Sequence, residues 1–208
     1  MKSFKIILLL GLLANLLNCN KIQEIKNQKH IIDTYKQSNV DRFYWEDSGQ
    51  DYEVIPLVKP FKLKKLKGSQ EWSVNTSVIS KEIKGLQPVI LFSCMNIYAY
   101  GFQDIDYFSD TKEIISPQTW FIINARTKNI DYYEKEYEFK AELKRISLPE
   151  KFLNPDEVYE EFKQDPVLEW FPEDIKKQLN KVKSSLKAMI VAFIIFLQSH
   201  MKPMKVTF

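Results

Sequence analysis

Trp120-Phe-Ile-Ile-Asn124 and Ile130-Asp-Tyr-Tyr133 flank the polar segment Ala125-Arg-Thr-Lys-Asn129. Aromatic and β-branched runs on either side of a short polar segment are typical of two antiparallel strands and the turn between them. The pattern therefore predicts a β-hairpin with a five-residue connection. Val89–Met95 and Ile97–Phe102 lie upstream and are strongly apolar, so we expect two further strands there.

Shorter runs of the same kind extend toward the N-terminus. Tyr52-Glu-Val-Ile55 is followed by Pro56 and Pro60, and proline restricts such a segment to an edge strand or an extended stretch. Gln70–Val74 and Ser77–Ile79 have the composition of further short strands. Together these runs predict an antiparallel sheet of five to seven strands.

Helical periodicity replaces this pattern after Tyr133. Residues 134–146 are rich in helix formers and precede Pro149. Asn154-Pro155-Asp156-Glu157 combines an N-cap, a proline at the first helical position and two acids in the first turn. A third helix is predicted from Pro172 to the region before Pro203. The fold class is therefore α+β, a sheet followed by three C-terminal helices, and residues 42–208 are expected to form one domain.

The composition excludes several classes of protein. The 208 residues carry a net charge of +3, too small a bias to indicate a nucleic-acid partner. Two cysteines cannot form a disulfide framework or a four-cysteine zinc site, and there are only two histidines. We expect no metal and no cofactor.

The segment that ends at Cys19 indicates where the protein resides. Lys2 and Lys5 precede the apolar run 6–17, which is shorter than the roughly 20 residues of a membrane span. With Leu16-Leu17-Asn18-Cys19 it resembles a bacterial lipoprotein signal, although such signals usually have a small residue where Asn18 stands. Other secretion or anchoring, and a buried helix with an apolar Cys19, are the alternatives.

The resemblance implies that the signal peptide 1–18 is removed and that Cys19 carries lipid. Residues 19–41 would then be a lipid-anchored tether or helix. The protein would be a membrane-anchored lipoprotein of the bacterial cell envelope, facing the periplasm or the exterior. Its partners would be the membrane and an unidentified envelope or effector protein.

A second, less specific resemblance covers residues 120–162. Phe121-Ile-Ile-Asn124, Thr127-Lys128, Ile130–Tyr133 and Glu136-x-x-Phe139 are similar to a strand–turn–strand–helix pattern in small bacterial lipoproteins of unknown function. This resemblance implies no activity.

The candidate binding residues are aromatic and basic. Trp45, Trp72 and Trp120 belong to a set of aromatic residues that either fills the core or lines an interface, where Trp and Tyr are enriched. Lys62, Lys64 and Lys65 belong to the lysine-rich run 59–67, which either protects an exposed sheet edge or contacts anionic lipid or an acidic protein.

No catalytic set emerges from the sequence. Asp104–Glu113 is the densest acidic segment, but it lacks the ligand positions of an EF-hand loop. Carboxylate pairs such as Asp104 and Asp106 leave an envelope hydrolase as an alternative. We expect no catalytic residues and a non-catalytic interaction module, for example an immunity or adaptor protein.

Ala188–Leu197 is apolar on every side of the last predicted helix. A half-buried helix explains such a run, and contact with the membrane is the alternative. In that case the protein is a structural lipoprotein whose C-terminal helix touches the bilayer.

Overall fold

A computed structural model describes residues 35, 38–45, 51–76, 78–79, 85–107 and 114–200. They divide into two compact units. One is Asp41–Lys176, and the other combines residues up to Val40 with those from Lys177 onward. The predicted signal peptide, Cys19 and nearly all of the predicted tether 19–41 lie outside the described residues.

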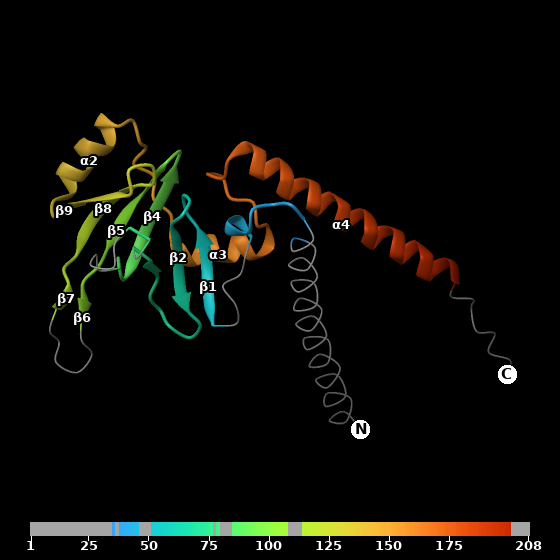
Figure 1. Cartoon of the computed structure of the whole chain (residues 1–208). Coiled ribbons are helices and arrows are strands. Elements are labelled where there is room, and N and C mark those ends of the chain that lie inside the picture. Colours follow the sequence, from blue (N-terminus) through green and yellow to red (C-terminus); the bar gives the residue numbers. More distant parts are fainter. Residues whose placement is uncertain are drawn as a thin grey trace, which may run out of the picture. The chain divides into compact units, whose positions relative to one another are not determined.

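Nine strands and four helices occur among the described residues (Figure 1). In chain order they are η1 (Arg42–Tyr44), β1 (Tyr52–Pro56), β2 (Lys62–Leu66), β3 (Ser73–Val74), β4 (Val89–Met95), β5 (Tyr98–Gln103), β6 (Asp106–Tyr107), β7 (Ile114–Ser116), β8 (Thr119–Asn124), β9 (Asn129–Tyr133), α2 (Glu136–Arg145), α3 (Pro155–Gln164) and α4 (Glu173–His200).

The α+β class is confirmed, with strands first and three α-helices after them. The expectation of one sheet is wrong, because the described strands form antiparallel sheets with the orders β1-β2-β3, β4-β5-β8-β9 and β6-β7. The ladder of the first sheet stops at the two-residue strand β3. Beyond it, the described residues before β4 add one isolated bridge, between Val74 and Leu86. The predicted strand at Ser77–Ile79 is also absent, since Val78 and Ile79 lie in a turn.

The predicted hairpin at the centre of the sequence pattern is confirmed as β8 and β9. The Asn124 side chain accepts hydrogen bonds from the backbone N–H groups of Arg126 and Thr127, at 3.0 and 3.2 Å. Lys128 has a φ of 56°, which allows the tight return of the chain. Asn129 already pairs with Asn124, so the connection is one residue shorter than expected.

Both faces of the four-stranded sheet are buried. Helix α2 packs on one face through a cluster formed by Tyr100, Ile122, Phe139, Leu143 and Leu148. The alternate positions of β5 and β8 lie on the opposite face, where Ala99, Phe121 and Ile123 are at most 1% exposed. The sheet therefore forms the centre of the larger unit.

The three-stranded sheet contributes an apolar row of its own. Ile55 pairs with Leu63, and Leu63 pairs with Val74, so the three side chains cross the sheet on one face. All three are fully buried. Helix α3 packs against β1 and β4, and begins as predicted with Asn154 accepting hydrogen bonds from two backbone N–H groups of its first turn.

Helix α4 continues without a break over 28 residues. Ile175 and Leu179 are buried at its start. No helix among the described residues is long and apolar enough to cross a membrane.

Candidate functional site

Lys65 lies in a row of polar side chains at the end of the three-stranded sheet. It pairs in register with Glu53 of β1, and its Nζ lies 2.9 Å from Glu53 Oε2. Trp72 directly precedes β3, and Lys65 Nζ lies 4.9 Å from the centre of its ring. Glu53 and Lys65 lie next to Ile55, Leu63 and Val74 on the same face of the sheet. Lys65 therefore lies beside the buried core.

The first turn of α3 completes this group of side chains. Asp156 Oδ1 accepts hydrogen bonds from Lys65 Nζ at 2.6 Å and from Trp72 Nε1 at 2.9 Å. Tyr159, one turn further on, packs edge-on against the Trp72 ring at 5.6 Å. We call Glu53, Lys65, Trp72, Asp156 and Tyr159 the Lys65 cluster. It connects the three-stranded sheet to α3.

Charge pairing sets the pKa values of Lys65 and Asp156. The hydrogen bond from Lys65 lowers the pKa of Asp156, and it outweighs the desolvation that acts in the opposite direction. Desolvation lowers the pKa of Lys65, but the hydrogen bonds to Asp156 and Glu53 outweigh it, so that pKa is raised. Both shifts favour the charged forms, and the cluster is an ion-pair network rather than an acid–base device.

The remaining lysines of the run 59–67 are distributed over different surroundings. Lys59 pairs with Asp41, and Lys62 Nζ lies 5.0 Å from the centre of the Phe43 ring. The expectation that this run protects a sheet edge is wrong, because β2 is the central strand between β1 and β3. β1, which ends at Pro56, is an edge strand, as predicted, and β3 is the other edge.

The other face of the same sheet has an exposed apolar pair. Tyr52 pairs in register with Leu66, and these residues are 42% and 51% exposed. Lys64 is half-buried on the same face, and Lys67 is exposed directly after β2. We call Tyr52, Lys64, Leu66 and Lys67 the Tyr52–Leu66 patch. Of these residues only Lys64 was a candidate binding residue from the sequence, and Lys67 belongs to the same lysine-rich run 59–67.

The three candidate tryptophans are not brought together. Trp45 is 8% exposed directly after η1, and Trp72 is 2% exposed within the Lys65 cluster. Trp120 is half-buried and stacks on Phe139 of α2 at 4.8 Å. Their surroundings are those of core residues, so they do not form a shared binding surface.

A hollow of about 500 Å³ lies beside the ends of β5 and β8. The Gln103 side chain is buried in its wall. Its Oε1 accepts a hydrogen bond from Gln87 N, and its Nε2 donates one to the Pro117 carbonyl, each at 3.2 Å. The Thr119 hydroxyl donates to the Tyr133 carbonyl. These buried polar groups already have hydrogen-bond partners within the protein. They are therefore poorly suited to recognise a ligand.

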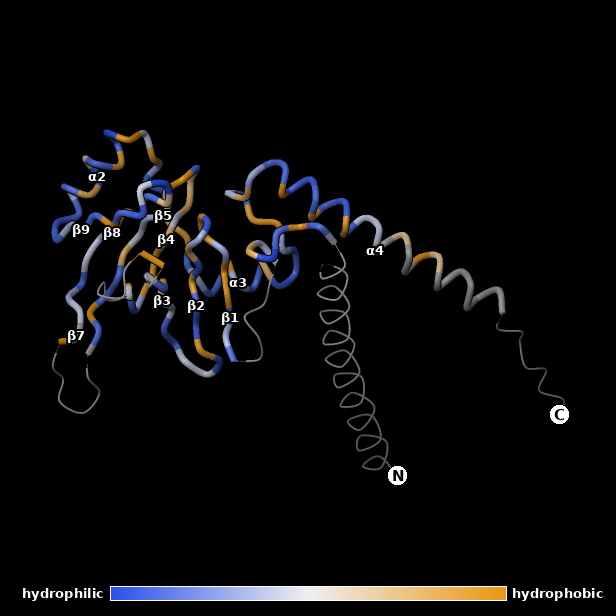
Figure 2. Tube along the Cα trace, in the orientation of Figure 1, coloured by the Kyte–Doolittle hydropathy of each residue, from blue (hydrophilic) through white to orange (hydrophobic). Residues whose placement is uncertain are grey.

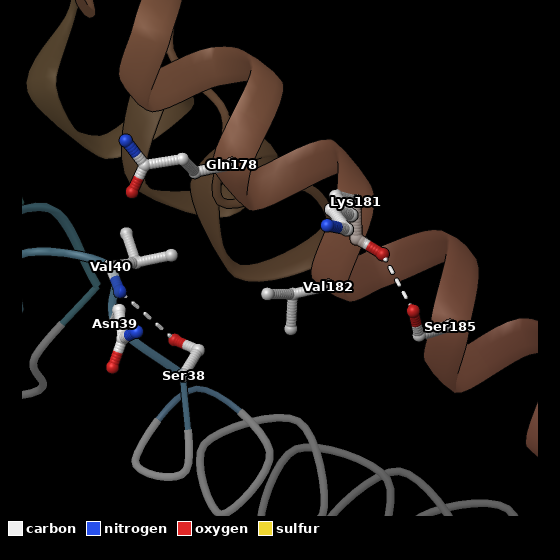
Figure 3. Close-up of a pocket in the computed structure, with 7 residues that line it drawn as sticks. All are labelled: Ser38, Asn39, Val40, Gln178, Lys181, Val182 and Ser185. Atoms are coloured by element: carbon white, nitrogen blue, oxygen red, sulfur yellow. Dashed lines mark hydrogen bonds between the residues drawn. The ribbon is translucent and has the colours of Figure 1, made fainter.

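A second hollow, of about 510 Å³, lies in the smaller unit (Figure 3). It is lined by Ser38, Asn39, Val40, Gln178, Lys181, Val182 and Ser185. The Ser185 hydroxyl donates to the Lys181 carbonyl at 3.1 Å, and Ser38 Oγ accepts from Val40 N at 3.3 Å. Its hydroxyl groups are thus bound to the backbone of their own segments.

The described titratable groups do not assemble a catalytic set. A carboxyl that acts as a general acid needs a raised pKa, whereas the pKa values of Asp41, Glu142 and Asp156 are lowered, chiefly by hydrogen bonds from Lys59, Arg145 and Lys65. Burial raises the pKa of the Cys94 thiol well above its usual value, which suppresses the reactive thiolate. Within the described ranges no group of three His, Cys, Asp or Glu side chains could hold a metal ion.

No protein-family model matches the chain, and neither a curated protein nor a solved structure matches it.

Proposed function

We propose that this protein is a lipid-anchored cell-envelope protein whose larger unit, Asp41–Lys176, is a non-catalytic interaction module. The anchor rests on the sequence: two lysines, a dozen mostly apolar residues and then Cys19. Several acyl groups on that cysteine would hold the protein firmly, whereas one chain gives only marginal binding.

The observation that supports the interaction role is the Tyr52–Leu66 patch. A tyrosine and a leucine lie side by side and exposed on a sheet face, with Lys64 on the same face and the exposed Lys67 next to Leu66 in the chain. Tyrosine is enriched among residues that dominate protein interfaces, and the surrounding lysines favour a partner of opposite charge. The proposed partner is therefore an envelope protein with an acidic rim around an apolar centre.

A photo-crosslinking experiment tests this proposal. Leu66 is replaced by a photo-reactive phenylalanine analogue in the full chain, and the crosslinked products are identified in the native envelope. The matched control carries the same analogue at Tyr137, which is 65% exposed on α2. We expect a protein adduct from position 66 that is absent from position 137.

Charge reversal then tests the chemistry of the partner. Lys64→Glu together with Lys67→Glu should remove the adduct at position 66, because like charges would face each other across the contact. An adduct that survives this reversal, or that forms equally at position 137, would contradict the proposed surface.

A further inference from the structure

Helix α4 changes character along its length. In its first half Ile175 and Leu179 are buried while Gln178 and Lys181 are exposed, so the helix is amphipathic there. From Ala188 to Leu197 the sequence contains no polar residue. Figure 2 shows the same change, because blue positions are frequent early in α4 and are absent from the coloured part beyond its middle.

One face of the helix shows the change most clearly. Residues three and four apart share a face of a helix. The exposed members of this face are Lys181, Ser184 and Ser185, followed by Ala188, Val191 and Ala192. The first three are polar and the last three are apolar, and Val191 is 55% exposed. The face that meets water at Lys181 is thus hydrophobic two turns later.

The length of the apolar segment limits what it can do in a membrane. Ten helical residues extend over about 15 Å, and the hydrocarbon core of a bilayer is about 30 Å thick. The segment is therefore too short to cross a bilayer, and its contact with one is limited to the boundary between headgroups and acyl chains.

The flanking charges identify the surface that such a segment fits. Lys181, Lys183 and Lys187 precede it, and Lys202 and Lys205 follow it in the sequence. Lysines at both ends of an apolar segment match the headgroups of anionic lipids, and their long side chains reach those headgroups from a shallow position. A second copy of α4 fits this surface less well. In a symmetric pair of helices, whether parallel or antiparallel, the flanking lysines of one copy would lie against those of the other.

We propose that residues 188–197 of α4 bind an anionic phospholipid bilayer by lying in its interface. The contact goes beyond the proposed lipid on Cys19, because it uses other residues and needs no acyl chain. It would give the protein a second, reversible attachment to the membrane surface.

The test places a fluorescent probe on α4 of the full chain in phosphatidylglycerol-containing vesicles. Val191→Cys is labelled with an environment-sensitive dye, and Ser184→Cys is the matched control on the polar half of the same face. The parent chain, treated with the same dye, serves as the blank for Cys19 and Cys94. Nitroxide-bearing lipids quench dyes in the bilayer, and iodide quenches dyes in water.

We expect emission at position 191 to be lost with nitroxide lipid and kept with iodide, and the reverse at position 184. Iodide quenching of equal strength at both positions would overturn the proposal. So would protection of position 191 from both quenchers, which would place it against protein, such as a second copy. In vesicles of neutral phosphatidylcholine the nitroxide quenching should weaken, and equal quenching in both vesicles would contradict the choice of anionic lipid.

This outcome is separate from that of the lipid anchor. The probe reports the surroundings of residue 191 itself, whereas acylation is measured at Cys19. If nitroxide lipid quenched the dye at position 191 in a chain that carries no lipid at Cys19, this inference would stand and the proposed anchor would be refuted.

Discussion

Removal of the Lys65 charge should destabilise the larger unit. In Lys65→Met the aliphatic stem is largely preserved, but the charge beside two carboxylates is lost. Glu53 Oε2 is buried, and the partner that the structure gives it is the Lys65 ammonium, 2.9 Å away. The variant therefore leaves a buried carboxylate oxygen without its countercharge.

The size of the effect follows from the exposure of each contact. A buried polar group that loses its partner costs about 1–3 kcal/mol. The Asp156 side chain is 58% exposed, so its pair with Lys65 adds only about 0.5 kcal/mol after screening by solvent. We expect the free energy of unfolding to fall by about 2 kcal/mol in Lys65→Met.

Tryptophan fluorescence during urea unfolding measures this change. All four tryptophans, at positions 45, 72, 120 and 170, lie within the unit Asp41–Lys176, so their emission reports on that unit. Lys64→Met is the matched control, because Lys64 lies on the opposite face of the same strand and should change stability by less than about 0.5 kcal/mol.

A second variant separates the charge effect from packing. Replacing both members of an ion pair by apolar residues is often close to neutral. Lys65→Met combined with Glu53→Met should therefore recover most of the lost stability. If Lys65→Met were no less stable than Lys64→Met, or if the double variant were less stable than Lys65→Met alone, the reasoning would be refuted.

Three further predictions concern other parts of the fold. Gly101→Ala should lower stability by about 1–3 kcal/mol in the same assay, because the added Cβ would lie 2.1 Å from the Leu91 carbonyl oxygen. Asn154→Ala should cost about 1 kcal/mol through loss of the N-cap of α3. The pKa of Asp156 is lowered by its hydrogen bond from Lys65, so its stabilising effect should be complete above about pH 4 and be lost as pH falls through the lowered pKa; Asp156→Asn should make this loss of stability shallower.

Matched controls accompany these variants. At Gly85 an added Cβ would lie 3.4 Å from the Val74 carbonyl oxygen, so Gly85→Ala should be tolerated far better than Gly101→Ala. Asn154→Asp keeps a capping oxygen and should retain most of the stability lost in Asn154→Ala. Equal losses within either pair would count against the corresponding contact, and an unchanged acid slope in Asp156→Asn would count against the pairing with Lys65.

Elements with strong local signals could be predicted from the sequence. The hairpin β8–β9 has two apolar runs and a turn, and α3 has its capping asparagine and proline, so both were predicted near their observed positions. The division into separate sheets could not be predicted in this way. The division depends on where the hydrogen-bonded pairing between strands ends. The pairing of the first sheet ends at β3, and a strand of two residues has no distinctive sequence pattern.

The candidate site was harder to predict, because it depends on pairing between distant residues. Asp156 meets Lys65 across 91 positions of sequence, and no local pattern links them. The sequence grouped Lys65 with the other lysines of the run 59–67, yet the register with Glu53 places it beside the core. The tryptophans were ambiguous for the same reason, since composition alone does not distinguish a core tryptophan from an exposed one.

The central claim is that Cys19 carries lipid, and metabolic labelling with an alkyne fatty acid tests it most directly. The full chain, Cys19→Ala and Cys94→Ala are expressed in bacteria, and the label on each purified protein is compared. The account predicts label on the parent chain and on Cys94→Ala, and none on Cys19→Ala. Equal labelling of Cys19→Ala and the parent chain would contradict it.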